Sequence, residues 1–276
     1  MHYSAMMIKE ARAAMALSPL EVEVLLAHIL KKDRSWILAQ EDYALTMAQQ
    51  EELQAASKRR KNGEPVAYIV GEKEFYGRSF SVDRRVLIPR PSTEGLILLV
   101  LDTLKGEKTE KTIRSVDTDI VAVARTRGDM STVDTVVDVG TGSGCIAVTL
   151  ACECPHLHII ATDCSGGAIT VAKENAHKHR VAGRIDFREG SDMQPLADLC
   201  EPFLLVSNPP YIPETEELER DVFSFEPHEA LFGGTDGTVM LRTIITQAAA
   251  HPWCRGIVME CKEEQASLLL HELQAW

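Results

Sequence analysis

The sequence predicts an α/β protein whose main part is a doubly wound, mostly parallel sheet, preceded by a small N-terminal helical bundle and a connecting β-hairpin. Apolar runs of strand length alternate with helical patterns from residue 135 onward, which is typical of a parallel sheet covered on both faces. Residues 4–61 have helical patterns, and residues 72–88 have the alternation of a hairpin. We therefore expect three regions, at 1–72, 73–91 and 92–276.

The N-terminal region contains a clear helix start at Ser18. Pro19 occupies the first helical position and Glu21 stands three residues after Ser18, which is the pattern of a capping box. Apolar residues then recur with a helical period through Leu30, so one face of this helix is expected to be buried. A further helix is expected at about 47–61.

The hairpin is expected within residues 73–91, where apolar residues alternate around Gly77 and a turn at 83–84. The Ile-Pro-Arg-Pro segment at 88–91 is expected to be extended, because residues before proline avoid the helical region. A helix is expected to follow at about 93–104.

Residues 105–132 are charged and rich in Gly, Thr and Ser, with only a short apolar run at 120–124. Loops of this length without clear structure are uncommon, and they are often either functional or disordered. We expect a mobile surface insertion here, with partner docking as the alternative role.

The remaining chain alternates between strands and helices. Ligands of such sheets bind at the carboxyl ends of the strands, near the topological switch point. Strands are expected at 135–139, 158–162, 185–187, 203–206 and 256–261, with helices that include 146–153, 168–178 and 238–250.

Composition excludes several classes of protein. The net charge of −12 argues against a free-standing nucleic-acid binder, because such proteins usually carry a basic face toward the phosphates. The N-terminal residues lack a long apolar stretch with a cleavage site, so no signal peptide is expected, and without an apolar run of about 18 residues no membrane span is expected. Its seven cysteines are irregularly spaced and fit no zinc-finger pattern, so free thiols and no metal site are expected. We expect a cytoplasmic protein that contacts neither membrane nor nucleic acid directly.

A glycine turn lies between an apolar strand and a helix start, at residues 136–147. Glycine lets the backbone turn sharply and approach a ligand, and the helix N-terminus offers free N–H groups. Dinucleotide enzymes favour G-x-G-x-x-G, whereas the spacing here is G-x-G-x-G with Asp138 two residues earlier. That acid suits the cationic end of S-adenosylmethionine. The residues assigned to this cofactor are Asp138, Gly140, Thr141, Gly142, Ser143 and Gly144.

Two further acids follow later strands. Asp163 ends the second strand, where a carboxylate can accept two hydrogen bonds from a ribose diol. The alternative is that it caps the next helix, and both roles can hold together. Asp192 is placed to accept from the adenine amine and Met193 to pack on the ring, unless both belong to a polar loop tip.

The most informative motif is Asn208-Pro209-Pro210-Tyr211, at the end of the fourth strand. Two prolines remove two backbone donors, which leaves mainly acceptors: the Asn208 side-chain oxygen and the Pro209 carbonyl. A planar –NH2 group is a poor nucleophile because its lone pair is delocalised. Two acceptors can aim it at the methyl donor and stabilise the positive charge that grows on nitrogen. Tyr211 would stack on the planar group.

Segments over nearly the whole chain resemble the PrmC/HemK family, which methylates the glutamine side-chain nitrogen in the Gly-Gly-Gln motif of class I peptide release factors. The Ile-Pro-Arg-Pro and Glu-Pro…Ala-Leu-x-Gly-Gly-x-Asp-Gly segments are more specific than Asn-Pro-Pro-Tyr, which many amino-methyltransferases share. The matching segments are 63–71, 74–77, 86–91, 138–147, 208–211, 225–227 and 230–237.

The resemblance implies a Rossmann-like class I methyltransferase domain at 92–276, S-adenosylmethionine as cofactor and release factors as protein substrate. It implies that the N-terminal helices help to grip the release factor, and we expect a monomer. Family cofactor positions match residues 140–144, Asp163, Met193 and Asn208. The glutamine site matches Asn208 to Tyr211, with Asn208, Pro209 and Tyr211 catalytic and Pro210 contacting the substrate.

The chain departs from the family pattern at Ser92, where an acid is usual, and in the longer insertion before the glycine loop. It also stops at Trp276, although the family fold normally continues with two more strands. This predicts an exposed sheet edge.

Other functions remain open at this point. One is methylation of an exocyclic base amine in DNA or RNA, which would use the same motif. Another is a catalytically impaired homologue that acts as a binding subunit. A nicotinamide oxidoreductase is disfavoured by the glycine spacing.

Overall fold

The structure is a computed structural model that describes residues 6–106, 110–115, 118–127 and 129–273. The chain divides into two compact units. The first unit is Met1–Glu72 with Leu218–Phe225, and the second is Lys73–Glu217 with Glu226–Trp276.

The first unit is helical. Ser18 caps α2 with a capping box, as predicted, because its side chain accepts from the Glu21 N–H while the Glu21 carboxylate accepts from the Ser18 N–H. Apolar faces of the helices meet in a separate core that includes Leu25, Leu26 and Leu53. The helices are α1 (Ile8–Ala14), α2 (Pro19–Leu30), α3 (Arg34–Ala39), α4 (Met47–Lys61), α5 (Val66–Val70) and α9 (Arg220–Phe225).

The short helix α9 joins this unit although it comes from far along the sequence. The Arg60 guanidinium lies 3.4 Å from the Asp221 carboxylate and also pairs with Glu21. A Cβ at Gly63 would lie 3.5 Å from the Phe225 ring. The segment just beyond the N-P-P-Y motif therefore contributes to the helical unit, which the sequence pattern did not predict.

The second unit begins with the predicted hairpin, β1 (Glu72–Phe75) and β2 (Arg78–Ser81), and continues with a seven-stranded sheet in the order β3-β4-β9-β8-β5-β6-β7. Strands β5 to β9 are parallel to one another along that order, as predicted. The sheet strands are β3 (Glu110–Arg114), β4 (Ile120–Thr126), β5 (Thr135–Val139), β6 (His158–Asp163), β7 (Ile185–Glu189), β8 (Phe203–Ser207) and β9 (Cys254–Lys262).

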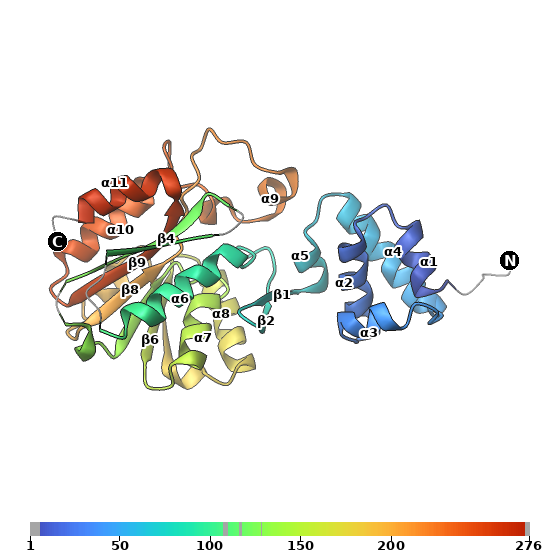
Figure 1. The fold of residues 1–276 in the computed structure, drawn as a ribbon, viewed down its shortest axis with the longest axis horizontal. Helices are drawn as coiled ribbons and strands as arrows, with labels where there is room; N and C mark the ends of the chain where they lie inside the picture. The colour runs from blue at the N-terminus through green and yellow to red at the C-terminus, as the bar shows by residue number, and fades with distance from the viewer. Residues whose placement is uncertain (1–5, 107–109, 116–117, 128, 274–276) are drawn as a thin grey trace. The chain divides into compact units, whose positions relative to one another are not determined.

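Helices cover both faces of this sheet, so it has two apolar cores. Figure 1 shows α6 (Glu94–Thr103) and α7 (Cys145–Glu153) on one face, and α10 (Val239–Ala250) and α11 (Glu263–Leu273) on the other. Helix α8 (Gly166–Lys178) adds Ala176 to the first core. Successive side chains of each buried strand point into one core and then the other. Both sets are apolar, which explains why these strands are continuous apolar runs in the sequence.

The prediction of a mobile loop at 105–132 is wrong for most of its described residues. β3 and β4 form an antiparallel pair, and β4 pairs antiparallel with β9. Val121 and Val123 face one core while Ala122 and Ala124 face the other, and all four are buried. The short apolar run was therefore a strand of the sheet. Residues 107–109, 116–117 and 128 lie outside the described residues.

The predicted exposed edge on β9 is also wrong, because β4 occupies that edge over the register from Ile120–Lys262 to Thr126–Gly256. The hairpin that precedes the glycine loop supplies two strands at the position where the resemblance implied strands after α11. The sheet thus reaches seven strands within the described residues.

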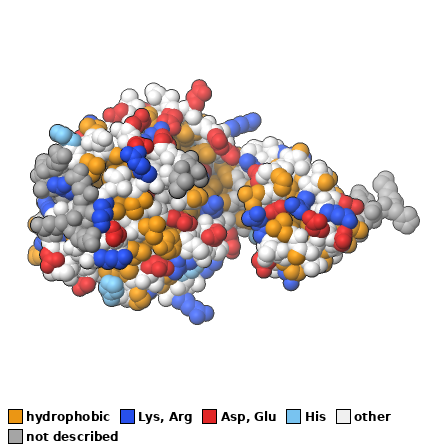
Figure 2. All heavy atoms as spheres, in the orientation of Figure 1, with side chains coloured by type: hydrophobic (Ala, Val, Ile, Leu, Met, Phe, Trp, Pro, Cys, Tyr) orange, Lys and Arg blue, Asp and Glu red, His pale blue; other side chains and the backbone are white. Residues whose placement is uncertain are grey.

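Surface properties add little that is distinctive. Figure 2 shows Lys and Arg interspersed with Asp and Glu over the face in view. No helix in the described ranges combines the length and apolarity needed to cross a bilayer. Within those ranges, His, Cys, Asp and Glu form no group of three or more that could hold a metal ion.

Candidate active site

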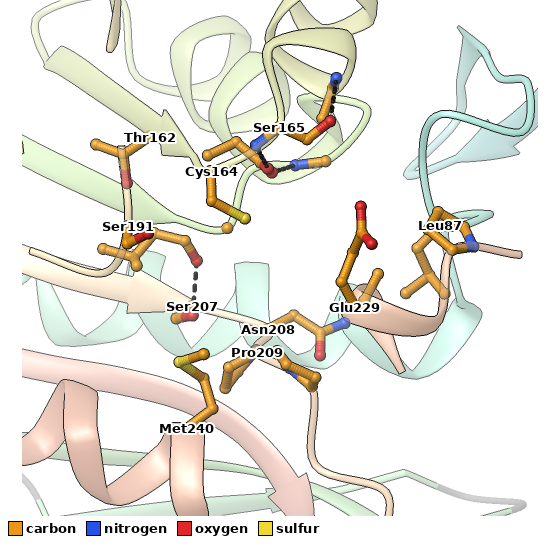
Figure 3. Close-up of a pocket in the computed structure, with 18 of the residues that line it drawn as sticks. Leu87, Thr162, Cys164, Ser165, Ser191, Ser207, Asn208, Pro209, Glu229 and Met240 are labelled. Carbon is orange, nitrogen blue, oxygen red and sulfur yellow. Dashed lines mark hydrogen bonds between the residues drawn. The ribbon is translucent and has the colours of Figure 1, made fainter. Parts of the chain in front are cut away.

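A cavity of about 220 Å³ lies in the second unit at the carboxyl ends of β5, β6 and β8. The glycine loop and the first residues of the N-P-P-Y motif border this same cavity, as Figure 3 shows for Asn208 and Pro209. Predicted site residues that line it are Gly140, Gly142, Asp163, Asp192, Asn208, Pro209 and Pro210.

Other predicted site residues lie behind the cavity wall. Met193 is 6% exposed and belongs to the core under α10, so its side chain serves packing in this structure. Tyr211 packs against the same core. The predicted residues that do not line the cavity are Asp138, Thr141, Ser143, Gly144, Met193 and Tyr211.

The glycine loop needs glycine for two different reasons. Gly140 and Gly142 have φ of 75° and 55°, and a Cβ at either position would meet no atom within 4 Å, so the constraint is backbone conformation. A Cβ at Gly144 would lie 3.1 Å from the Ala172 Cβ, so this glycine lets α7 pack closely on α8. The loop therefore presents bare backbone to the cavity at its first two glycines.

Asp138 is fully buried beneath the loop. Its Oδ2 accepts from the Thr141 hydroxyl at 2.7 Å and from the Ala147 N–H at 3.2 Å, which ties β5 to the start of α7. Its Oδ1 is buried without a hydrogen-bond partner among the described residues. Burial raises the pKa of this carboxyl to about 7. An unpaired buried oxygen of this kind favours a cationic ligand group nearby.

Asp163 closes the loop from the end of β6. Its Oδ2 accepts from the Gly142 N–H and its Oδ1 from the Ser165 N–H, both at 2.9 Å. Ser165, rather than Asp163, caps α8 by accepting from the Ala168 N–H. Burial raises the pKa of Asp163. Each carboxylate oxygen keeps a further lone pair, so Asp163 can still accept from a ligand hydroxyl.

Asn208 is held by a residue from a distant segment. Its Nδ2 donates to the Thr93 hydroxyl oxygen at 3.0 Å. With the donor end engaged, the side-chain oxygen is the end that remains for a ligand. Next to it, the fully buried Ser207 hydroxyl donates to the Val139 carbonyl at 2.7 Å, which joins β8 to β5 just before the glycine loop.

Tyr211 is anchored at two points. Its hydroxyl donates to Glu260 Oε1 on β9 at 2.9 Å, and its carbonyl accepts from Gln265 Nε2 at 2.9 Å. Burial beside the Glu260 carboxylate raises the pKa of Tyr211, so the phenol stays a donor. A Cβ at Gly237 would lie 2.2 Å from the Tyr211 carbonyl oxygen, and one at Gly233 would lie 2.4 Å from that of Pro210. The Gly-Gly-x-Asp-Gly segment thus packs directly on the motif's backbone.

Comparison with known proteins gives a consistent result. Residues 8–71 match the model of the PrmC N-terminal domain, and residues 127–224 match that of the methyltransferase small domain. The release factor glutamine methyltransferase of Koribacter versatilis is 37% identical over 88% of this chain and 79% of its own length. That of Chlorobaculum tepidum is 41% identical over 78% of this chain and 69% of its own.

The chain belongs to the family of release factor glutamine methyltransferases. As a methyltransferase of this family, it uses S-adenosylmethionine. The chain also matches longer proteins: it is 38% identical to a bifunctional methyltransferase of Rickettsia typhi, of whose length it spans only 42%. The catalytic domain of hMettl16, solved in complex with a 3'UTR hairpin, has a TM-score of 0.50 at 14% identity over 85% of this chain and 76% of that chain, which supports the fold alone.

Two of the segments that carry the resemblance to this methyltransferase family contact each other. Glu226, whose side chain is 1% exposed, accepts from the Arg90 guanidinium at 2.6 Å and from the Ile88 N–H at 3.0 Å. The Glu-Pro segment therefore fixes the Ile-Pro-Arg-Pro segment, which in turn leads to Thr93 and its bond to Asn208.

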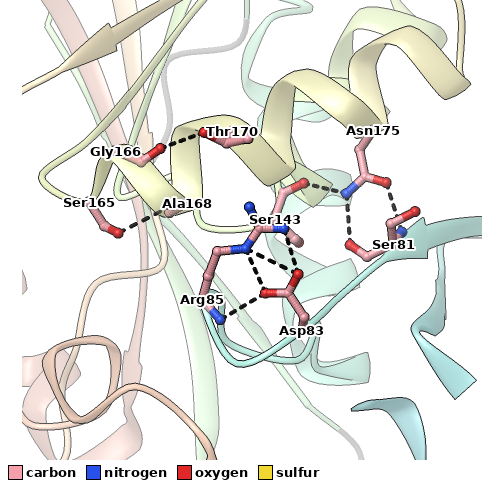
Figure 4. A network of polar contacts seen from close by, with 9 residues as sticks. All are labelled: Ser81, Asp83, Arg85, Ser143, Ser165, Gly166, Ala168, Thr170 and Asn175. Carbon is pink, nitrogen blue, oxygen red and sulfur yellow. Dashed lines mark hydrogen bonds and ion pairs between the residues drawn. The ribbon is translucent and has the colours of Figure 1, made fainter. Parts of the chain in front are cut away.

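Asn175 on α8 makes a similar link behind the loop of the methyltransferase. It exchanges hydrogen bonds with the Ser81 backbone at 2.7 and 2.9 Å and donates to the Ser143 carbonyl at 2.9 Å (Figure 4). The β-hairpin is thereby joined to the glycine loop. Asn175 is 0% exposed, so these bonds satisfy a buried amide.

Several lining residues were missed by the sequence analysis. Glu229 lies between the Glu-Pro and Ala-Leu segments that carry the resemblance, so its neighbours could have indicated it, whereas Met240 and Ile244 come from the first half of the amphipathic helix α10 and gave no signal. The missed lining residues include Arg85, Val86, Leu87, Thr162, Cys164, Ser165, Glu229, Met240 and Ile244.

The residues of the cavity fit the methyl donor. Asp163, Asp192 and Glu229 make the lining acidic, and Arg85, the one Lys or Arg among the described residues that line it, is paired with Asp83 at 2.6 Å. This balance suits a ligand with net positive charge at its reactive centre. Thr162 also lines the cavity, and its buried Oγ1 has no partner among the described residues.

Proposed function

We propose that this chain transfers a methyl group from S-adenosylmethionine to the side-chain amide nitrogen of the glutamine in the Gly-Gly-Gln motif of class I peptide release factors. The observation that carries this proposal is that the glycine loop and Asn208 line one cavity. The acceptor atoms for the glutamine amide and the glycine backbone that would lie against S-adenosylmethionine thus border the same space, so the two reactants could be bound there together.

In this proposal the cavity wall holds the methyl donor. Asp163 accepts from the ribose hydroxyls, Asp192 accepts from the adenine amine, and the backbone at Gly140 and Gly142 allows close approach. Buried Asp138 supplies negative charge behind the loop, while Thr141, Ser143 and Gly144 hold the loop's shape. When bound, S-adenosylmethionine supplies an electrophilic methyl group on a sulfonium centre.

The N-P-P-Y motif orients the acceptor nitrogen. The Asn208 oxygen and the Pro209 carbonyl accept the two N–H bonds of the glutamine amide, and Pro210 adds no competing donor. Holding both N–H bonds stabilises the positive charge that develops on nitrogen, and orientation of two bound reactants can supply up to about 7–11 kcal/mol of barrier reduction. The methylated amide cation is strongly acidic and releases its proton afterwards, so no strong base is needed.

Tyr211 has a more specific place in the proposal. Its ring would border the glutamine side chain from beyond the cavity wall, in an orientation set by its bond to Glu260. The helical first unit would help to grip the release factor. We further propose that the chain acts as a cytoplasmic monomer.

Two alternatives lose support. The impaired-homologue hypothesis arose from strands that the sequence lacked after α11, and β3 and β4 fill that edge of the sheet. Methylation of a base amine would need a basic groove, whereas the net charge is −12, and on the one face that Figure 2 shows Lys and Arg are interspersed with Asp and Glu.

The test is to incubate the chain with labelled S-adenosylmethionine and a class I release factor, beside the same factor with its Gly-Gly-Gln glutamine changed to alanine. Label is expected on the unmodified factor alone. Label on DNA or RNA and on neither protein would overturn the proposed substrate.

A further inference from the structure

Glu260 is a charged residue in the middle of a buried strand. It lies on β9, where its neighbours Met259 and Cys261 are buried apolar residues, and it is itself 1% exposed. Burying a carboxylate is costly unless polar groups compensate it. Its surroundings therefore indicate what the carboxylate does.

Those surroundings are the N-P-P-Y motif and the segment that holds it. Oε1 accepts from the Tyr211 hydroxyl at 2.9 Å, at one end of the motif. Thr93, 1% exposed, accepts from Asn208 at the other end, and its polar side chain lowers the pKa of the nearby Glu260, whose Oε2 is buried without a hydrogen-bond partner among the described residues. Burial raises the pKa of Glu260, and although the polar groups of Thr93, Tyr211 and Asn208 and the charge of Arg90 oppose it, the pKa is still raised to about 7.

Glu260 does not line the cavity, so it is not placed to touch either reactant. Its polar neighbours are closer to the reactants: Asn208 lines the cavity, and Tyr211 borders the glutamine side chain in the proposed function. Removing its carboxylate would leave the Tyr211 hydroxyl unpaired in a buried site and remove the bond that fixes the position of the hydroxyl end of the ring. Asn208 would lose part of the polar frame that fixes its amide.

We propose that Glu260 is a positioning residue for methyl transfer, which together with Thr93 holds the two ends of the N-P-P-Y tetrapeptide in register with the cavity. This inference rests on the proposed function. A misplaced acceptor orients the glutamine amide less well but does not weaken cofactor binding. We therefore expect loss of the Glu260 carboxylate to lower kcat and to leave the affinity for S-adenosylmethionine unchanged.

The test compares Glu260→Ala and Glu260→Gln with Tyr211→Phe and the double variant Tyr211→Phe/Glu260→Ala. Glu264→Ala is the matched control, since that glutamate lies four residues away and is exposed. We expect Glu260→Ala to lower kcat about tenfold or more, with the calorimetric Kd for S-adenosylmethionine changed less than about twofold. Glu260→Gln keeps an acceptor of the same shape, so it should recover most of the rate even if the alanine variant folds poorly.

Non-additivity supplies the second criterion. If Glu260 acts through Tyr211, adding Glu260→Ala to Tyr211→Phe should cost clearly less than it costs alone. Unchanged kcat in folded Glu260→Ala, or strictly additive losses, would overturn the inference.

A readout without substrate separates this inference from the proposed function. Ultraviolet resonance Raman spectra of ligand-free protein, with Tyr211→Phe as the difference reference, report the hydrogen-bond state of the Tyr211 hydroxyl. Loss of its donor signature in Glu260→Ala supports the positioning role, and an unchanged signature contradicts it. Failure of the wild-type chain to methylate any release factor would count against the proposed function alone.

Discussion

Glu226 and Arg90 form a bond of 2.6 Å between two segments that lie 136 residues apart in sequence. The other carboxylate oxygen of Glu226 accepts from the Ile88 N–H. One buried side chain thus holds the extended Ile-Pro-Arg-Pro segment, and that segment delivers Thr93 to Asn208. The Glu-Pro segment, the Ile-Pro-Arg-Pro segment and Asn208, which are far apart in sequence, are therefore linked in turn by hydrogen bonds beside the candidate active site.

Removing this bond should destabilise the second unit. Glu226→Ala leaves the Ile88 N–H unsatisfied and a half-buried guanidinium unpaired, so the free energy of unfolding in urea should fall by about 1–3 kcal/mol. Glu217→Ala, at an exposed glutamate, should change it by less than about 0.5 kcal/mol. Equal values for the two variants would show that the bond contributes nothing.

Asn208→Ala should abolish most transfer while largely keeping the fold. The substitution removes an acceptor aimed at developing charge, and loss of one such group typically lowers kcat by about 100-fold or more. Thermal unfolding should be little changed, because Asn208 is only partly buried. Either retained activity or unfolding of the variant would contradict the assigned role.

Asp138→Asn should change how stability depends on pH. Burial raises the folded-state pKa of Asp138 from 3.8 to about 7, so the folded chain binds more protons than the unfolded chain between those values. The stabilisation of the folded state that comes from the protonated Asp138 carboxyl is therefore fully present below about pH 4 and is lost as the pH rises to about 7. The stability of the variant relative to wild type should increase by a few kcal/mol between pH 4 and pH 8 in ligand-free protein, since one pKa unit corresponds to about 1.4 kcal/mol. A difference that stays flat across this range in denaturant titrations would rule out the raised pKa.

Val123→Ala should behave as a core substitution, although it lies in a segment that looks like a loop in sequence. Val123 on β4 is 1% exposed, so we expect a loss of about 1–3 kcal/mol in the free energy of unfolding. Asp119→Ala, at an exposed residue just before β4, is the control and should be close to neutral. Hydrogen exchange of β9 amides should also quicken in Val123→Ala, which a surface loop would not cause.

Gly237→Ala should cost more than Gly77→Ala. Both glycines have positive φ, 72° and 69°, so alanine pays a similar backbone cost of about 1–2 kcal/mol at each. Only at Gly237 would the new Cβ also meet the Tyr211 carbonyl oxygen, whereas at Gly77 nothing lies within 4 Å. Turnover should therefore fall in Gly237→Ala and persist in Gly77→Ala, as measured by label transfer to the release factor.

The sequence by itself determined the features that local patterns encode. An apolar strand followed by G-x-G-x-G specifies β5, its turn and α7 without reference to distant residues, and the capping box at Ser18 specifies the start of α2. The N-P-P-Y motif indicated its own place at a strand end for the same reason. These elements are confirmed because their geometry depends on neighbours in the chain.

Tertiary structure alone decided which distant segments meet. β4 looked like part of a loop because its partner, β9, lies more than a hundred residues later, and a short strand is stable only when both cores cover it. The partners of Glu260 and Glu226 were equally invisible, since a carboxylate in a sequence carries no sign of what it will accept from. Which strands pair, which residues are buried and which groups surround a buried carboxylate are decided only when the whole sheet has formed. The hydrogen bonds that hold the residues of the candidate active site depend on all three.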